Sequence, residues 1–340
     1  MSNFEETILV LLKDKLKAVK RNQIVTGEIP FECDFPQTIK NINKKGEIKH
    51  KDRSHDFYLY SLADNLIKPM DKRVYGMYCN GSGNELESKM RALRSSSAMT
   101  YNLFGNHETV TLNGLSSKSI ADGKYTVEFE KQLFTLDESK TSAPANLDAF
   151  LTNGDTVVAC EMKMMEWFST NNSNLKKAYI NENYYKTCSQ GNAFNVFFEL
   201  ASHLIDKNGQ IVINDSIEEY KTFFNRYDCF QMFKHTLACY NYCAENKGEI
   251  KNLTLLNCVW EIKNINSIED VKIRDKYKKI STEERQGFDL FKNLLRPIKN
   301  LFKNELGVEF NVEYIPYYDM INSVANLSND EKAYLDRYII

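Results

Sequence analysis

Two carboxylates and a lysine, Asp148, Glu161 and Lys163, have the types and spacing in this chain that best suit chemistry. They lie on either side of Asn153-Gly154, the strongest short signal for a hairpin, because a type I′ turn needs positive φ at both central positions. With these two residues as the loop, Phe150 pairs with Val157, and Asp148 shares one face with Glu161 and Lys163. The two acids then become diagonal neighbours, with Cα atoms roughly 7–8 Å apart.

The opposite face of the second strand carries only apolar side chains and therefore needs a core. Its members are Val158, Cys160, Met162 and Met164. On the polar face, two carboxylates at that separation can hold one hard divalent cation, which takes oxygen ligands. Such an ion polarises a phosphate and lowers the pKa of a bound water, while a nearby ammonium group stabilises developing charge. The trio therefore predicts metal-assisted phosphodiester hydrolysis.

The tripeptide Glu-x-Lys is by itself a weak signal, because it occurs eight times in this chain. The context of residues 161–163 sets them apart: a strand with an apolar back face, a hairpin turn and an acid at the matching position. The nearest rival, Glu261-Ile262-Lys263, follows a strand-like segment but has no upstream hairpin partner that carries an acid. The alternative interpretation of residues 161–163 is a solvated strand face with a Glu–Lys pair.

The arrangement Asp148…Glu161-Met162-Lys163 resembles the active-site motif of the PD-(D/E)xK nuclease superfamily. The proline of that motif is displaced here, since Pro144 stands four residues before Asp148. The wider text is similar to an uncharacterised nuclease-like branch of the superfamily, over roughly residues 81–260. Three further segments carry that likeness: Gly81-Ser82-Gly83-Asn84-Glu85-Leu86, the stretch from Arg94 to Gly105, and Val127-Glu128-Phe129-Glu130.

The resemblance implies an α/β fold with a restriction-endonuclease-like core, a mixed β-sheet flanked by helices, and helical additions at both termini. It implies Mg²⁺, with Mn²⁺ as a substitute, held by Asp148, Glu161 and an acid from the first core helix. Glu85 is the best match for that acid, and Glu87 and Glu130 compete with it. In relatives, a later helix brings a glutamine or tyrosine towards the catalytic lysine. Gln231 is the supporting residue that matches.

Composition fits a globular protein and limits the partners. The chain has 340 residues, 42% of them hydrophobic and 26% charged, and a net charge of −2, so any nucleic-acid contact must use a local patch. Eight cysteines without CxxC pairs indicate free thiols in a reducing compartment, and five unclustered histidines give no indication of zinc. Without a signal peptide or an apolar span, we expect a cytoplasmic protein that does not bind membranes.

Apolar spacing predicts the order of the elements. We expect helices over 2–22, 56–70, 81–99, 175–206, 216–246 and 282–304, strands over 125–136, 252–263 and 307–314 besides the hairpin, and a short C-terminal helix. Residues 1–80 are expected to form a helical and irregular extension, and residues 81–340 the nuclease-like domain. The serine run at 95–97 is expected to end a helix, and the tyrosines at 314, 317 and 318 to pack at a strand end.

Two functions from different classes follow. The first is a Mg²⁺-dependent deoxyribonuclease, an endonuclease of restriction or defence type. The second is a nucleic-acid-binding or scaffolding protein that keeps the fold without cleaving. The intact Asp148, Glu161 and Lys163 favour the first, because a non-catalytic relative would be free to lose one of them. The sequence leaves open RNA as a substrate, the cleavage specificity, and whether a homodimer or a partner protein supplies that specificity.

Overall fold

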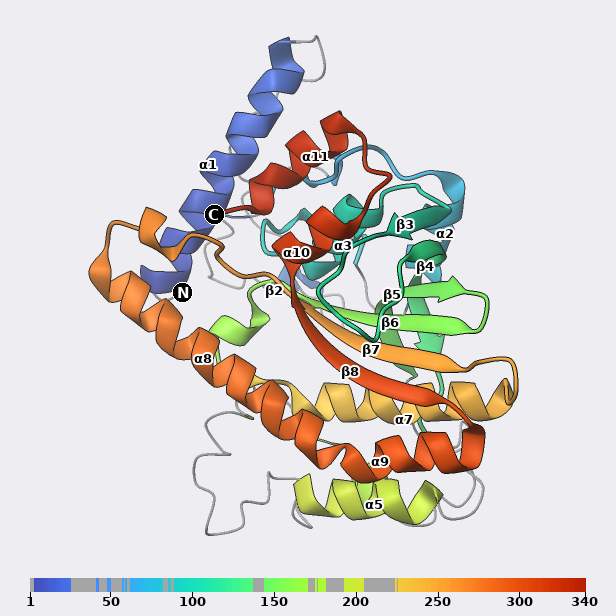
Figure 1. Cartoon of the computed structure of the whole chain (residues 1–340). Coiled ribbons are helices and arrows are strands. Elements are labelled where there is room, and N and C mark those ends of the chain that lie inside the picture. Colours follow the sequence, from blue (N-terminus) through green and yellow to red (C-terminus); the bar gives the residue numbers. More distant parts are fainter. Residues whose placement is uncertain are drawn as a thin grey trace.

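A six-stranded mixed sheet forms the centre of the protein, and helices cover both of its faces (Figure 1). The computed structural model describes residues 3–25, 41–42, 48–49, 57, 59, 62–81, 85–86, 89–136, 144–170, 175, 177–181, 193–204, 224 and 226–340. The strands of the sheet follow the order β3-β4-β5-β6-β7-β8. Neighbours are antiparallel from β3 to β6 and parallel from β6 to β8. The predicted α/β class with a mixed sheet between helices is confirmed.

The elements have the following bounds. The strands are β3 (Thr109–Leu112), β4 (Gly123–Leu133), β5 (Ala145–Asn153), β6 (Thr156–Lys163), β7 (Asn252–Val259) and β8 (Glu309–Pro316), with a separate pair β1 (Asn41–Ile42) and β2 (Ile48–Lys49). The helices are α1 (Asn3–Val25), α2 (Lys72–Asn80), α3 (Ser96–Phe104), α5 (Ala193–Leu204), α7 (Cys229–Glu245), α8 (Val271–Leu294), α9 (Arg296–Leu301), α10 (Tyr317–Ser323) and α11 (Asn329–Leu335). None of the helices in the described ranges is long and apolar enough to cross a membrane.

Each face of the sheet has its own core. Val158, Cys160 and Met162 of β6 pack into the first core with α3, α10 and α11, so the predicted apolar back face is confirmed. Val157 and Ala159 belong to the second core with α5, α7, α8 and α9. Figure 1 shows α5, α7 and α9 together beneath the sheet.

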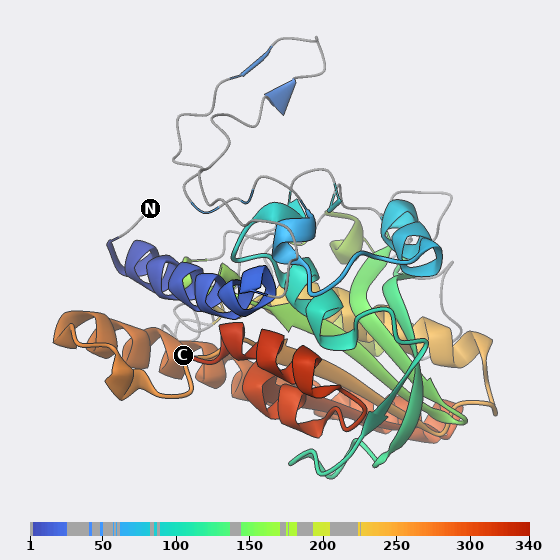
Figure 2. The same ribbon diagram turned by 90° about the horizontal axis from the view of Figure 1, so that it is seen from above.

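The first helix packs onto the C-terminal part of the chain. Residues of α1, among them Phe4, Ile8 and Leu12, are buried in the first core together with Leu335 and Tyr338. Figure 2 shows α1 beside the C-terminal helices.

The predicted hairpin exists, but its register was wrong by one residue on each strand. Asn153 pairs with Thr156, so the loop is Gly154-Asp155 and not Asn153-Gly154. Gly154 has φ +58°, whereas Asp155 is not among the residues with positive φ. A type I′ turn needs positive φ at both central positions, and a glycine at the first position alone fits type II′. The Asp155 carbonyl also accepts the N–H of Lys251, which ties the turn to the start of β7.

Two predicted helices were also wrong. Within the described part of residues 56–70, only a 3₁₀ turn over Ala63–Asn65 is present. Its neighbours bond to α3, since Asn102 accepts from the Ile67 N–H and donates to the Asn65 carbonyl. The predicted helix over 81–99 is interrupted, because Ser95 caps the N-terminus of α3 by accepting the Ala98 N–H. The serine run therefore begins a helix and does not end one.

The first helix, the strands β4, β7 and β8 and a short C-terminal helix are present with shifted bounds. The helices expected over 175–206, 216–246 and 282–304 are present only in part: α5 begins at Ala193 after a 3₁₀ turn over Lys177–Ile180, and α7 begins at Cys229. The last of them is divided into α8, α9 and a π turn over Phe302–Leu306. The six cysteines in the described ranges are free, as expected, and Cys239 and Cys243 are buried. Tyr314 is partly buried and Tyr317 fully buried, so both pack within the protein, as predicted.

Candidate active site

Three neighbouring strands each bring one acid to the same place. Ala149 of β5 pairs with Cys160 of β6, and continuing that register sets Asp148 opposite Glu161. Asp148 and Glu161 are therefore direct cross-strand neighbours and not the diagonal neighbours predicted. On the other side of β5, the pairs that flank Asp148 set it opposite Glu130 of β4.

The strands are irregular where these acids meet. Glu130 has φ +50°, the only positive φ of a non-glycine residue in the described ranges. Before it, Phe129 packs in the first core, and after it, Leu133 packs in the second core. On β5, Leu147 packs in the second core and Ala149, two residues later, packs in the first core. The side-chain alternation thus reverses at the two acids, a backbone distortion that costs of order 1–3 kcal/mol and is common at functional sites.

Lys163 and Glu161 form the best-connected pair of the site. Lys163 Nζ lies 2.9 Å from Glu161 Oε1 and also donates to the side-chain oxygen of Gln231. Gln231 Nε2 donates to Glu161 Oε1 at 2.8 Å, and His235 Nε2 lies 2.9 Å from Glu161 Oε2. Gln231 therefore lies where the resemblance implied, in contact with both the lysine and the acid.

The charges of this pair are strongly perturbed. Burial alone would raise the pKa of Glu161, but Lys163 and His235 together hold that pKa at about 2. Burial would lower the pKa of Lys163, yet Glu161, Asp228 and Glu166 raise it above its ordinary value. At neutral pH the site therefore holds a carboxylate and an ammonium group in contact, and the side chains of Glu161 and Lys163 are 4% and 16% exposed.

The other two strand acids are electrostatically unfavourable when charged. Burial, and then the charges of Glu161 and Glu130, raise the pKa of Asp148 well above its ordinary value, although its carboxylate accepts the Met162 N–H at 2.7 Å. Burial and the nearby Glu85 raise the pKa of Glu130 to about 7. Buried carboxyl groups that repel one another bind either protons or a cation.

Glu130 is held from two sides. Asn146 donates to one of its carboxylate oxygens. A Cβ built on Gly81 would lie 3.0 Å from the same oxygen, so Gly81 leaves the space that this side chain occupies. The asparagine and the glycine fix Glu130 towards the cleft.

A cleft of about 520 Å³ separates these strands from the segment around α3. Glu85 faces the strand acids across it, and its carboxylate accepts hydrogen bonds from Lys89 and Ser97, both at 2.8 Å. Arg94 also lines the cleft. The cleft thus has an acidic floor and a wall that carries cationic groups.

The acids suit a metal ion in their chemistry, but they are not arranged as a ready-made binding group. No set of three or more His, Cys, Asp or Glu side chains among the described residues is placed to hold an ion. Both oxygens of Glu161 already have protein partners. Asp148 and Glu130 remain as oxygen donors whose raised pKa values a hard cation would relieve.

Five of the predicted site residues lie together in the cleft. Asp148, Glu161, Lys163, Glu85 and Gln231 all line the cleft. Glu87 lies outside the described residues. In the rival motif, Glu261 is bound to Arg285 and accepts the Tyr314 hydroxyl at 2.8 Å, and Lys263 lies over the Tyr318 ring.

Sequence reasoning missed His235 and Asn146. His235 follows Gln231 by four residues, so the two lie on one face of α7, and this spacing could have revealed it. Asn146 precedes Asp148 by two residues on β5. Because the side-chain alternation reverses between them, the alternation rule does not predict how these two side chains are placed.

Comparisons with protein-family models, with curated proteins and with solved structures found no match. The resemblance to the PD-(D/E)xK nucleases therefore rests on the residues of this chain and stays a prediction.

Proposed function

We propose that this protein is a metal-dependent nuclease that hydrolyses DNA phosphodiester bonds, an endonuclease of restriction or defence type. The observation that carries the proposal is the contact of Lys163 with Glu161 in a cleft whose floor also holds Asp148 and Glu130. A buried ammonium group next to several carboxylates is a costly arrangement, and such strongly perturbed groups in a cleft are typical of functional sites.

The proposed roles follow from the contacts. Asp148 and Glu161, with Glu85 or Glu130, would hold Mg²⁺ or Mn²⁺, and the bound ion would supply Lewis-acid activation of the phosphate and of a water. Lys163 stays protonated, so it can donate hydrogen bonds to a phosphate oxygen or orient the attacking water.

Other residues would position these groups and the DNA. Gln231 accepts from Lys163 and donates to Glu161, which fixes the distance between ammonium and carboxylate. Lys89, whose side chain is 60% exposed, and Arg94 lie on the opposite wall, where they would attract backbone phosphates.

One observation favours the second candidate, a nucleic-acid-binding or scaffolding protein that does not cleave. The charge of Lys163 already balances that of Glu161, and His235 occupies its other carboxylate oxygen, so Glu161 does not need a metal ion for charge balance. In such a protein the same contacts would serve stability alone.

A cleavage assay separates the two candidates. The purified wild-type protein is incubated with plasmid, linear duplex and single-stranded DNA and with RNA, in Mg²⁺, in Mn²⁺ and in EDTA. The nuclease proposal expects metal-dependent cleavage of DNA that Glu161→Gln abolishes. The matched control, Glu261→Gln, changes the acid of the rival motif and should cleave like wild type. Binding of DNA without cleavage in any metal would instead favour the scaffolding function.

A further inference from the structure

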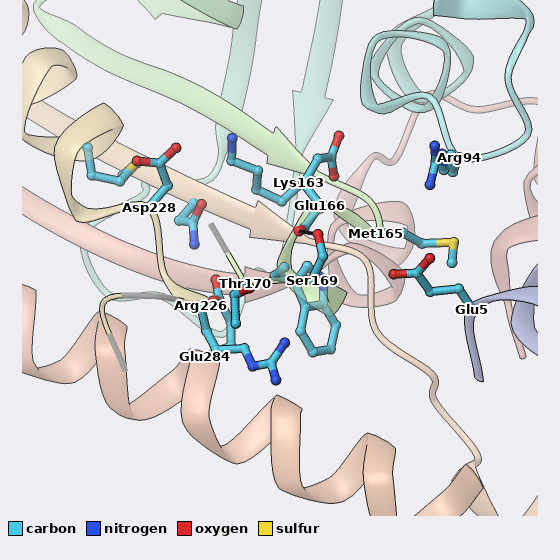
Figure 3. Close-up of a pocket in the computed structure, with 13 residues that line it drawn as sticks. Glu5, Arg94, Lys163, Met165, Glu166, Ser169, Thr170, Arg226, Asp228 and Glu284 are labelled. Carbon is cyan, nitrogen blue, oxygen red and sulfur yellow. Dashed lines mark hydrogen bonds between the residues drawn. The ribbon is translucent and has the colours of Figure 1, made fainter. Parts of the chain in front are cut away.

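A second cavity, of about 490 Å³, adjoins the cleft on the far side of Lys163. Arg94, Lys163 and Glu166 line both spaces. Figure 3 shows side chains from β6, from the start of α7 and from α8 around this cavity, with Lys163, Asp228 and Glu284 among them. Its size lies within the range of about 300–1,000 Å³ that is common for small-molecule sites.

Two buried side chains that line this cavity each carry a polar atom without a hydrogen-bond partner among the residues that the structure describes. Glu284 of α8 is 2% exposed, and its Oε2 atom is unpaired. Asn257 of β7 is 1% exposed, and its Nδ2 atom is unpaired. A buried unpaired polar group costs about 1–3 kcal/mol, so each such group in a native protein calls for an explanation, and a bound water, ion or ligand is one.

The two groups can contact one ligand with complementary hydrogen-bonding groups. The Asn257 amide nitrogen donates. Burial, together with the charges of Asp228 and Glu261, raises the pKa of Glu284 to about 8, and the opposing charge of Lys163 offsets only part of this rise. At neutral pH this carboxyl is therefore mostly protonated, and it can both donate and accept.

The remaining lining favours a neutral ligand with an apolar face. The lining carries three cations and three acids besides Glu284, so neither an anion nor a cation is strongly attracted; they are Arg94, Lys163 and Arg226, and Glu5, Glu166 and Asp228. Trp167, Met165 and Met232 also line the cavity and supply apolar and aromatic contacts. An aromatic heterocycle with a hydrogen-bonding edge fits all of these features.

We propose that this cavity binds a nucleobase next to the phosphate at Lys163, and that Glu284 and Asn257 contact the edge of that base. Lys163 lines both spaces, so a nucleotide with its phosphate in the cleft can place its base in the cavity. The identity of the ligand as a base rests on the proposed nuclease function. The site itself rests on the two unpaired groups.

The test measures binding without catalysis. Saturation-transfer NMR is recorded in EDTA with each of the four deoxynucleosides and with wild type, Glu284→Gln, Glu284→Leu and Asn257→Val. Glutamine keeps a neutral donor and acceptor, so Glu284→Gln should retain the signals of the base protons. The leucine and valine variants each lose one hydrogen-bonding group, and their Kd should rise about three- to tenfold, as expected for one hydrogen bond. Asp289→Asn, an exposed position on α8, is the matched control and should bind like wild type.

Thermal unfolding shows whether each variant is folded. Glu284→Leu replaces an unpaired buried carboxyl by an apolar group, so it should unfold at or above the wild-type temperature. If it does not fold, the Asn257→Val result decides.

Three outcomes would overturn the inference: no saturation of base protons in wild type, equal saturation in the leucine and valine variants, or loss of saturation in Asp289→Asn. If wild type cleaves DNA but binds no nucleoside, this inference fails and the nuclease proposal stands. If wild type binds nucleosides through Glu284 but never cleaves, the base site stands and the nuclease proposal fails.

Discussion

Replacing Glu130 with glutamine should stabilise the protein at alkaline pH and leave it nearly unchanged in acid. The pKa of Glu130 rises from 4.5 to about 7 on folding, because burial and the charge of Glu85 disfavour the carboxylate. The folded state therefore holds the proton more tightly than the unfolded state. The resulting stability is fully present below pH 4.5 and is lost as the pH rises through about 7.

The size of this effect follows from the shift. Each pKa unit corresponds to 1.36 kcal/mol, so the full shift sets an upper limit of about 3 kcal/mol, and relaxation of the coupled acids should reduce it to about 2 kcal/mol. Urea denaturation of wild type and Glu130→Gln across this pH range measures it. The gain in unfolding free energy should be near zero at the acid end and reach about 2 kcal/mol at about pH 8.

Glu128→Gln, two residues earlier on β4, is the control. Its side chain is 39% exposed and paired with Lys131, so its effect should stay below about 0.5 kcal/mol at every pH. A gain for Glu130→Gln that does not change between acid and alkaline pH would refute the electrostatic description of the acid cluster.

Two further predictions concern the same cluster. Calorimetry should show binding of Mg²⁺ or Mn²⁺ that Asp148→Ala abolishes, because this variant removes one of the oxygen donors, and tight zinc binding without a Mg²⁺ or Mn²⁺ response would count against the assignment. His235→Phe should lower the unfolding free energy by about 1–3 kcal/mol, because Glu161 Oε2 loses its partner inside the protein. An unchanged urea midpoint for His235→Phe would show that this contact is not important for stability.

The residues that share the polar face of the hairpin could be predicted from sequence, because side chains alternate between faces and a register shift by an even number of residues leaves the faces unchanged. The true register shifts each strand by one residue, and the two shifts together keep Asp148 on the face of Glu161. The choice between Asn153-Gly154 and Gly154-Asp155 as the loop was not predictable, since either pair places a glycine in the turn. It depends on contacts with residues near the start of β7, about a hundred positions later.

The sequence named Glu130 only as a competitor of Glu85, and its position opposite Asp148 could not be predicted, because it depends on a backbone conformation that the alternation rule does not describe. A left-handed φ at a glutamate is costly and is stabilised only by its surroundings, here the amide of Asn146 and the space beside Gly81. The helix expected over 56–70 was wrong for a similar reason. Its apolar spacing was helical, but the side chain of Asn102 binds the backbone there instead.

The most direct test of the proposed function compares Lys163→Ala with Lys263→Ala, one lysine from each Glu-x-Lys motif. Lys163 contacts Glu161 in the cleft, whereas Lys263 is exposed and lies over the Tyr318 ring. DNA cleavage rates with Mg²⁺ are measured for both variants, with circular dichroism to check that each is folded. We expect Lys163→Ala to lose about 10²–10³-fold in rate, as for other groups that stabilise transition-state charge, and Lys263→Ala to cleave like wild type. Normal cleavage by a folded Lys163→Ala protein would contradict the assignment of this site.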